Sequence, residues 1–338
     1  MTHLEEAGRR VRDGLASGLL DLVDSEGVIR SGDAARRLGL PRNLLIEIAH
    51  DLKSRCLIHL ETHLFREAEL IRLPRSEREA PAGGFRARVI AVSNQKGGVG
   101  KTATSVNLSA ALALLGRKTL LLDLDSQANA TSGLGFNKHE IKRSIYDAMV
   151  NYTPLSEIIL HTSTTNLDLI PSNVHLAGVN IELVNLPSRE TRLRRVLSEV
   201  KGSYEFIIID CPPSLGLLTV NGLVAADSVL VPIQCDYYAL EGISKLLGTL
   251  DLVRERLNPS LRIEGILLTM FDARTNLSTQ ISENVRSYFK EKVYNTVIPR
   301  NVKLSEAASF GKSILDYDRY SSGARSYLSL AKEVTAGG

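Results

Sequence analysis

Residues 96–102 read Lys96-Gly97-Gly98-Val99-Gly100-Lys101-Thr102, and this stretch decides the fold. An apolar run, 89–92, precedes it, and a run with helical spacing of apolar residues, 105–115, follows it. A strand, a glycine-rich loop and a helix in this order form the context that a phosphate-binding loop requires. We therefore expect a nucleotide phosphate site here rather than a chance turn rich in glycine.

The residue types of this loop suit phosphate binding. Backbone N–H groups must turn toward the phosphate oxygens, and glycine lacks the Cβ atom that would obstruct this approach. The start of the following helix adds the positive end of its dipole. Lys101 is expected to reach the β- and γ-phosphates, and the Thr102 hydroxyl is expected to bind Mg²⁺. Lys96 is not needed by an ordinary phosphate loop, so it is either a solvated surface lysine or a lysine that reaches the nucleotide of a second subunit.

Length and composition indicate a cytoplasmic globular protein with one large domain and a smaller one. The chain has 338 residues and a formal net charge of +3, which is too small to mark the whole chain as a nucleic-acid binder. Its three cysteines are widely scattered and show no metal-ligand spacing, which favours a reducing compartment. The first residues lack the apolar core of a signal peptide, and no apolar run is long enough to span a bilayer.

Residues 1–73 have the pattern of a small separate domain. Apolar spacing predicts helices and then a two-stranded wing, over 4–23, 31–40 and 41–55, then 57–60 and 65–73. This order resembles a winged helix-turn-helix domain, with 41–55 in the place of the recognition helix. Acidic residues in the segment roughly cancel its arginines, so DNA contact and a role in dimerisation or partner docking stay equally open. Residues 74–87 are rich in Pro, Gly, Ala and charge and are predicted to be a linker.

Residues 88–338 alternate between apolar strands and helical patterns. Predicted strands after the phosphate loop are 118–125, 166–171, 206–210, 229–233, 263–270 and 293–298, and helices between them include 189–201, 240–257 and 277–289. This alternation predicts an α/β domain with a mainly parallel sheet and helices on both faces. Ligands then bind at the carboxyl ends of the strands, where the phosphate loop lies.

Three aspartates follow predicted strands at this edge. Asp210 ends the apolar run 206–209, which is the Walker B pattern of a buried strand that delivers a carboxylate toward Mg²⁺. Asp123 and Asp125 end the preceding strand with a spacing of two residues, so both are expected to point the same way. One of them should lie near the γ-phosphate, where it can orient the attacking water. The alternative for Asp125 is to cap the helix that follows.

Five separated motifs occur in a fixed order, and they read Asn94-Gln95-Lys96-Gly97-Gly98-Val99-Gly100-Lys101-Thr102, Asp123-Leu124-Asp125-Ser126-Gln127-Ala128-Asn129-Ala130-Thr131-Ser132-Gly133-Leu134-Gly135, Ile209-Asp210-Cys211-Pro212-Pro213-Ser214-Leu215-Gly216, Gln234-Cys235-Asp236-Tyr237-Tyr238-Ala239-Leu240-Glu241-Gly242 and Val297-Ile298-Pro299-Arg300-Asn301-Val302-Lys303-Leu304-Ser305-Glu306-Ala307. Together they resemble the ParA/Soj partition ATPases, which have a deviant Walker A motif and belong to the MinD/ParA superfamily. The resemblance covers residues 88–335, and chromosomal Soj proteins are the most similar members. Residues 1–73 are then an extension that the short Soj-type proteins lack.

The resemblance implies an ATPase that binds ATP and Mg²⁺ and forms a homodimer with both nucleotides at the interface. Lys96 is then the signature lysine that reaches the partner's nucleotide, Lys101 holds phosphate during hydrolysis, and Asp125 matches the hydrolytic aspartate. Thr102 and Asp210 are implied to hold the metal. The residues implied to contact the nucleotide are Lys96, Gly97, Gly98, Val99, Gly100, Lys101, Thr102 and Ala103, with Pro299 and Asn301 at the adenine.

The resemblance also implies that the ATP-bound dimer binds double-stranded DNA without sequence preference through Arg274 and Lys303. Phosphate contacts require only a continuous stripe of positive charge, which Arg300 and Arg286 are candidates to extend. A ParB-type protein then stimulates slow hydrolysis, and the dimer releases the DNA. This reading predicts a cytoplasmic, nucleoid-associated protein that segregates a chromosome or plasmid and has no membrane partner.

The chain departs from the family pattern at three positions, and two rival functions stay open. Ala103 replaces the usual threonine, and Ser126 and Ala308 each replace a proline. One hydroxyl contact near the α-phosphate is lost, but backbone amides carry most of that site, so nucleotide binding is expected to survive. The first rival is an ATP-controlled transcriptional regulator, autoregulatory in some plasmid relatives, that reads DNA with residues 1–73. The second is a MinD-like membrane ATPase, for which the C-terminal segment 327–334 is short and barely basic.

Overall fold

The structure is a computed structural model, and it describes residues 28–30, 37–38, 58–62, 68–72, 84–184, 188–236 and 241–337. The chain divides into two compact units, Met1–Gly84 and Phe85–Gly338. Each unit is described by itself below. The domain boundaries expected from the sequence, 1–73, 74–87 and 88–338, stay a prediction.

The first unit contains a three-stranded antiparallel sheet in the order β1-β3-β2, built from β1 (Val28–Arg30), β2 (Ile58–Thr62) and β3 (Ala68–Arg72). β2 and β3 pair from Ile58 opposite Arg72 to Thr62 opposite Ala68. These strands coincide with the wing expected at 57–60 and 65–73. Of the predicted helices, 4–23 and 41–55 lie outside the described residues, as does 31–40 apart from the helical residues 37–38. The winged-helix assignment therefore stays a prediction.

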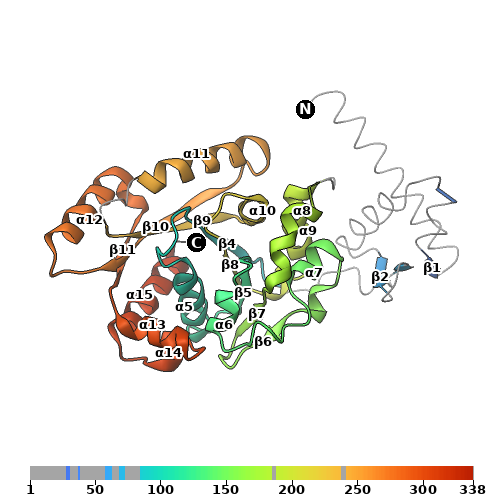
Figure 1. Cartoon of the computed structure of the whole chain (residues 1–338), viewed down its shortest axis with the longest axis horizontal. Helices are drawn as coiled ribbons and strands as arrows, with labels where there is room; N and C mark the ends of the chain where they lie inside the picture. The colour runs from blue at the N-terminus through green and yellow to red at the C-terminus, as the bar shows by residue number, and fades with distance from the viewer. Residues whose placement is uncertain are drawn as a thin grey trace. The chain divides into compact units, whose positions relative to one another are not determined.

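The second unit is built around an eight-stranded sheet in the order β11-β10-β9-β4-β8-β5-β7-β6 (Figure 1). The strands are β4 (Arg88–Val92), β5 (Thr119–Asp123), β6 (Leu160–His161), β7 (Leu167–Ile170), β8 (Phe206–Asp210), β9 (Ser228–Gln234), β10 (Arg262–Phe271) and β11 (Val293–Pro299). All neighbours pair in parallel except β6, which is antiparallel to β7. The predicted fold class, a mainly parallel α/β sheet of the P-loop type, is confirmed.

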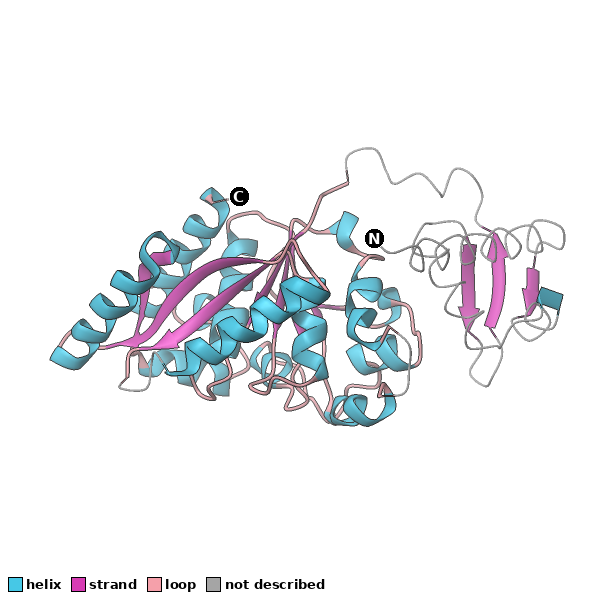
Figure 2. Cartoon of the chain, turned by 90° about the horizontal axis from the view of Figure 1, so that it is seen from above, coloured by secondary structure: helices cyan, strands magenta, loops and turns pink. Residues whose placement is uncertain are grey.

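Helices cover both faces of this sheet (Figure 2). They are α5 (Lys101–Leu114), α6 (Asn129–Gly133), α7 (Ile145–Val150), α8 (Val179–Glu182), α9 (Arg192–Leu197), α10 (Leu217–Ala225), α11 (Glu241–Arg256), α12 (Asn276–Phe289), α13 (Val302–Ser309), α14 (Ile314–Tyr317) and α15 (Ser322–Ala336). The apolar side of the C-terminal helix α15 packs on α5 and β11, so this side belongs to the core.

Alternation along the central strands divides the core into two layers. In β4, Val89 and Ala91 join the cluster under α7, α9, α10 and α11, whereas Ile90 and Val92 join the cluster under α5, α14 and α15. Successive side chains of a strand point to opposite faces, so a strand buried on both faces must be apolar at every position. This is why these strands are continuous apolar runs, and why polar residues at their carboxyl ends stand out.

Two elements differ from the sequence expectations. The helix expected from 105 begins at Lys101, because the apolar periodicity was the signal and the first helical turn is polar. The helix expected over 189–201 is α-helical only over Arg192–Leu197, between two short 3₁₀ turns.

Candidate nucleotide-binding site

Three neighbouring strands bring the residues expected to bind the nucleotide together at the carboxyl ends of the strands, called this edge of the sheet below. β4, β8 and β5 lie side by side, with Val92 opposite Asp210 and Asp123 opposite Asp210. The glycine-rich loop leaves the carboxyl end of β4 and enters α5, so it lies beside both strand-end aspartates. Ligands of open α/β sheets bind at this edge.

The backbone of the loop requires glycine at two positions. Gly98 has φ +75° and Gly100 has φ +88°, in the left-handed region that side chains with a Cβ rarely adopt. Two side-chain hydrogen bonds join the loop segment to strands β10 and β9. The Thr269 hydroxyl donates to the Val99 carbonyl at 2.9 Å, and the Asn94 amide donates to the Pro232 carbonyl at 2.7 Å. The loop is therefore tied to the sheet by contacts within this chain.

Lys101 is the first residue of α5, directly after the loop, and is 7% exposed. Its Nζ donates to the Lys96 carbonyl at 3.0 Å. Burial lowers the pKa of this amine, and the charges of Asp210 and Asp125 act in the opposite direction. An anionic ligand at the loop would compensate the burial of this positive charge, as a phosphate group does.

Asp210 is fully buried at the end of β8. Its Oδ1 accepts a hydrogen bond of 2.9 Å from the Ser105 hydroxyl, while its Oδ2 has no hydrogen-bond partner among the described residues. Burial and the nearby Asp123 raise the pKa of this carboxyl group, and the hydroxyls of Thr102 and Ser105 oppose the shift. A buried carboxylate oxygen without a partner is costly unless a cation satisfies it, so the residues present fit a divalent metal ion beside Thr102.

The other two aspartates have different surroundings, and they do not both end a strand as expected. Asp123 ends β5 and is fully buried, and its Oδ2 accepts 2.8 Å hydrogen bonds from the amide and the hydroxyl of Thr131. Asp125 lies two residues beyond the strand and accepts from the Gln127 amide at 3.0 Å. The Asp123 side chain thus holds the segment that contains Thr131 in place. Asp125 is the freer of the two and also acts on the charge of Lys101.

A cavity of about 480 Å³ continues from the loop toward the end of β11. Its lining includes Gly100 and Ala103 on one side and Pro299 and Asn301 on the other. The structure therefore brings together the residues expected at the phosphates and those expected at the adenine, although they are separated by about two hundred residues in the sequence. A second cavity of about 350 Å³ shares Ala103 with the first and also borders Thr102.

Lys96 is partly exposed and paired within the chain. Its Nζ forms an ion pair with Asp236, at the end of β9, and both side chains are about one-third exposed. The other oxygen of Asp236 is buried without a hydrogen-bond partner among the described residues. The lysine thus has an in-chain carboxylate partner, and its reach to the nucleotide of a second subunit stays a prediction.

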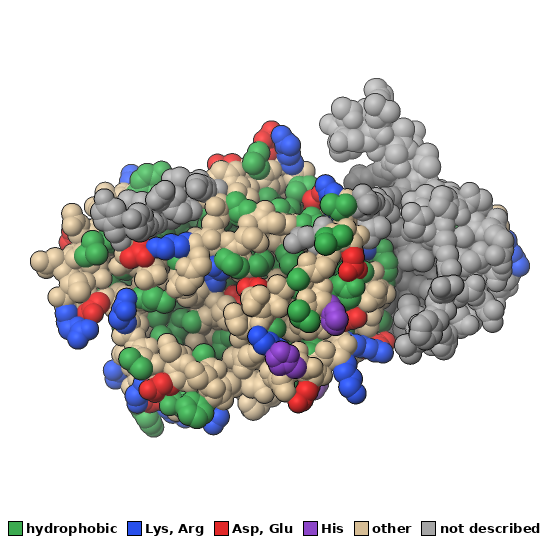
Figure 3. Space-filling view, in the orientation of Figure 1, with side chains coloured by type: hydrophobic (Ala, Val, Ile, Leu, Met, Phe, Trp, Pro, Cys, Tyr) green, Lys and Arg blue, Asp and Glu red, His purple; other side chains and the backbone are tan. Residues whose placement is uncertain are grey.

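The basic residues predicted to contact DNA lie near the same edge. Arg274 and Lys303 follow the carboxyl ends of β10 and β11, which are parallel neighbours with Phe271 opposite Pro299. Each is paired within the chain, Arg274 with Asp272 and Lys303 with Asp318. On the face drawn in Figure 3, basic and acidic side chains are interspersed along the rim.

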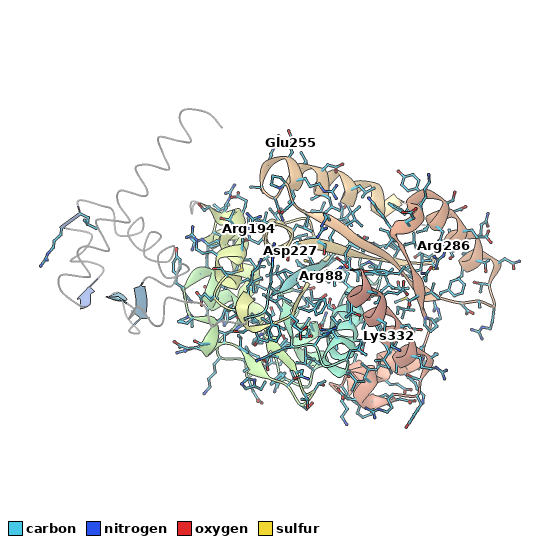
Figure 4. All side chains as sticks on the ribbon, turned by 180° about the vertical axis from the view of Figure 1, so that it is seen from behind. Arg88, Arg194, Asp227, Glu255, Arg286 and Lys332 are labelled. Carbon is cyan, nitrogen blue, oxygen red and sulfur yellow. The ribbon has the colours of Figure 1, made fainter. Side chains whose placement is uncertain are left out.

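Arg286 is set back from the carboxyl end of β11. Its guanidinium donates to the carbonyls of Tyr294 and Asn295, at the amino end of β11, at 3.1 and 3.4 Å (Figure 4). These carbonyls lie four and five residues before Pro299, about 13–17 Å back along the strand, so Arg286 is set back from Arg274 and Lys303.

Sequence reasoning gave no role to four residues that support the site: Ser105, Thr131, Asp236 and Thr269. Ser105 follows Thr102 by one helical turn, so its position three residues after the motif was a usable signal. Asp236 was quoted in a motif, but its partner Lys96 is 140 residues away, and only the sheet order β9-β4 brings them together.

This fold and site define a P-loop nucleoside triphosphatase. The sequence profile of an AAA domain family matches residues 87–263. The sporulation initiation inhibitor protein Soj of Bacillus subtilis (strain 168) is 59% identical over 251 residues, which are 74% of this chain and 99% of that protein. The chromosome partitioning protein ParA of Myxococcus xanthus (strain DK1622) is 54% identical over 247 residues, 73% of this chain and 87% of that protein. The chain belongs to the ParA/Soj family of partition ATPases.

Solved structures agree with the fold. A crystal structure described as cobyrinic acid a,c-diamide synthase from Mycobacterium smegmatis, with bound ADP and magnesium, has a TM-score of 0.66 and 36% identity. The alignment covers 74% of this chain and 94% of that chain. Within the described part of the chain, none of the helices combines the length and apolar character that a membrane crossing needs.

Proposed function

We propose that this chain is a DNA-partitioning ATPase that dimerises when it binds ATP, binds DNA without sequence preference, and releases it after hydrolysis. The observation that carries the proposal is the buried Asp210, whose unpaired Oδ2 lies at the strand end beside a loop that positions Lys101. A negative pocket for a metal ion beside a positive loop for phosphates is the arrangement that a Mg²⁺-nucleotide requires. The relatives named for chromosome partitioning support the biological role.

In this proposal the nucleotide is ATP with Mg²⁺, and the supporting relative contains ADP and magnesium. Backbone amides of 97–102 and Ala103 surround the phosphates, while Pro299 and Asn301 hold the adenine in the 480 Å³ cavity. Thr102 and Asp210 hold the metal ion, which supplies charge neutralisation at the phosphates when it is bound. Lys101 binds the γ-phosphate. The negative charge of the phosphate stabilises the protonated amine, which burial otherwise disfavours.

Asp125 is proposed to orient the attacking water. Asp123 is less suited, because both of its oxygens already accept hydrogen bonds from Thr131 and from the Asp125 amide. One Asp125 oxygen accepts from the Gln127 amide, which leaves its second oxygen for a water molecule.

Lys96 is proposed to reach the nucleotide of a second copy of the chain in a homodimer. For that, its amine must exchange the Asp236 carboxylate for a phosphate of the partner's nucleotide. Both groups are anions, so the exchange keeps a charge-assisted hydrogen bond on the lysine.

The dimer is proposed to bind double-stranded DNA through Arg274 and Lys303, which two subunits present twice. A ParB-type protein then stimulates slow hydrolysis, so that ATP times the attachment to the nucleoid in the cytoplasm. Such use of a γ-phosphate to hold one conformational state is common among nucleotide switches.

The test is binding of the full-length protein to random-sequence duplex DNA with ATP, ADP or no nucleotide, at two salt concentrations. We expect ATP-dependent, salt-sensitive binding that Arg274→Glu abolishes. The matched control is Arg143→Glu, because Arg143 is another exposed arginine paired with a carboxylate, near the β7–β6 end of the sheet. Binding that ignores ATP, or that is equally sensitive to both variants, would overturn the proposed DNA surface.

A second candidate is an ATP-controlled transcriptional regulator that reads DNA with the first unit, and the three-stranded sheet at 28–30, 58–62 and 68–72 favours keeping it. It predicts DNA binding that is lost when residues 1–80 are removed and that persists in Arg274→Glu. We expect residues 86–338 to fold on their own, because the Bacillus relative aligns over 99% of its length with 74% of this chain. A MinD-like membrane role ranks below both, since the apolar side of α15 is buried on α5 and β11.

A further inference from the structure

The two cations assigned to DNA are both occupied by an aspartate of their own chain. Arg274 forms two parallel contacts with Asp272, from Nε to Oδ1 at 2.9 Å and from Nη2 to Oδ2 at 2.8 Å. Lys303 forms an ion pair with Oδ2 of Asp318. The Arg274 side chain is nevertheless 86% exposed, and that of Lys303 is 52% exposed, so solvent and large ligands can approach both.

The Arg274 pair has the geometry that arginine uses for a phosphate group. Two parallel N–H···O contacts on one side of the guanidinium form the same fork whether the acceptor is a carboxylate or a phosphodiester. Asp272 therefore occupies the position that a DNA phosphate would take. Phosphate and Asp272 cannot use this fork together, because their charges have the same sign.

The local backbone holds Asp272 in place. Its Oδ1 also accepts from the Arg274 amide at 3.1 Å, and its carbonyl accepts from the hydroxyl of Thr275, the residue that caps α12. Hydrogen bonds from Arg274 lower the pKa of Asp272 to about 2, so the carboxylate stays charged throughout the physiological range. The aspartate is thus a fixed anion rather than a passing contact.

Asp318 repeats the arrangement on a different element. Its Oδ1 accepts from the Tyr320 amide at 3.1 Å, and its carbonyl accepts from the hydroxyl of Ser321, the residue that caps α15. Its Oδ2 is left for Lys303. Two unrelated turns therefore each present a fixed carboxylate to one of the two predicted DNA-contacting cations.

We propose that Asp272 and Asp318 are built-in competitors of DNA phosphate, which weaken the DNA affinity of the ATP-bound dimer and its dependence on salt. This inference rests on the DNA surface assigned under the proposed function. An unpaired surface cation that binds a DNA phosphate displaces about one counterion from the DNA. When the cation must first leave an aspartate, that aspartate gathers a cation from solution in its place, so the net release is smaller. The aspartates thus keep DNA binding weak, so that hydrolysis of the bound ATP is sufficient to release the DNA.

The test compares the full-length protein with Asp272→Asn, Asp318→Asn and the double variant. Asparagine keeps the side-chain oxygen that accepts from the backbone amide, so each turn retains its hydrogen bond while the competing charge is removed. Affinity for random-sequence duplex DNA with ATP is measured across a salt series. We expect each single variant to bind about twofold to fivefold more tightly at low salt, and its log affinity to fall more steeply with log salt.

The control is Glu157→Gln. It also removes one negative charge from an exposed arginine pair, Arg143–Glu157, but near the β7–β6 end of the sheet. A general effect of net charge would strengthen all of these variants equally and would overturn the inference. Unchanged or weaker DNA binding by Asp272→Asn and Asp318→Asn would also overturn the inference. If Arg274→Glu still failed to bind DNA in that case, the proposed DNA surface would stand. If Arg274→Glu and Lys303→Glu both kept full DNA binding, the proposed DNA surface itself would fail.

Discussion

Two sets of aspartates lie at the same edge of the sheet and have opposite properties. Asp123 and Asp210 are fully buried at the ends of β5 and β8, and burial raises the pKa of both carboxyl groups. Asp272 and Asp318 lie at the surface after β10 and before α15, and their cationic partners lower the pKa of both. The same side chain is thus held toward its neutral form in one place and toward its charged form in the other.

The difference shows which carboxylates can receive a cation from outside. A buried carboxylate pays for desolvation and gains from any cation that reaches it, as the unpaired Oδ2 of Asp210 indicates. A surface carboxylate that already holds an arginine or lysine gains little from another cation, and its main effect is to neutralise that partner. One set is therefore suited to a metal ion, and the other to the control of an anionic ligand.

The largest expected effect comes from removing Lys101, the buried lysine beside Asp210. Lys101→Ala should lower ATP hydrolysis by at least about 10²- to 10³-fold, because a fixed positive charge at the transferred phosphate is lost. Phosphate release at saturating ATP measures this. The control is Lys118→Ala, since Lys118 is exposed and contacts the ring of Tyr204. Hydrolysis that survives Lys101→Ala would mean that the buried pocket is not the catalytic one.

The second prediction compares one aspartate from each set by the same substitution. In the intact protein, Mg²⁺ and ATP at about one hundred times the dissociation constant should add about 2.7 kcal/mol of stability, a rise in Tm of about 5–10 °C. Asp210→Asn should lose most of this rise, because the metal ion loses its buried carboxylate. Asp272→Asn should keep the whole rise. Differential scanning fluorimetry with and without Mg²⁺ measures both, and an equal loss in the two variants would contradict the distinction between the sets.

The third prediction concerns the hydroxyl that supports Asp210. Ser105→Ala removes the donor of the 2.9 Å hydrogen bond to Oδ1. This hydrogen bond favours the charged form of Asp210, which a metal ion requires, and a bond to a charged group contributes about 1.5 kcal/mol, so affinity for Mg²⁺-ATP should fall up to about tenfold. Titration with a fluorescent ATP analogue measures it. Ser109→Ala, one turn further along the buried side of α5, is the matched control and should bind normally.

The sequence placed the glycine-rich loop after a strand and Asp210 at the end of another strand, and the structure has both there, because these signals are local. The loop 96–102 is contiguous, and Asp210 is marked by the apolar strand that ends at it, so a motif captures both. The order of strands and helices followed from continuous apolar runs, which only a sheet covered on both faces explains. Pro299 and Asn301 came from the family resemblance, and the cavity that they share with Ala103 agrees with it.

The remaining features depend on contacts that leave no pattern. The Lys96–Asp236 pair joins residues 140 apart through the order of the sheet. The different surroundings of Asp123 and Asp125 depend on where β5 ends, and a spacing of two residues could not reveal it. Arg286 was added to the basic stripe on charge alone, although its guanidinium donates to the carbonyls of Tyr294 and Asn295, four and five residues before Pro299. Surface ion pairs such as Arg274–Asp272 leave no periodic pattern in the sequence. Arg274 was therefore counted as a single positive charge, although the structure pairs it with a carboxylate.

The smallest expected effect concerns the stability of the surface set. Asp272 has a lowered pKa in the folded state, so its pairing stabilises the protein above the unfolded pKa of about 4, and this contribution is lost as the pH falls toward 2. At pH 7, Asp272→Asn should therefore lower Tm by no more than about 2 °C, because a screened surface pair contributes little and asparagine keeps the turn. The difference from the intact protein should shrink further in high salt. A fall of many degrees would show that Asp272 is required to build the α12 turn, and it would then be unable to act as an exchangeable competitor of phosphate.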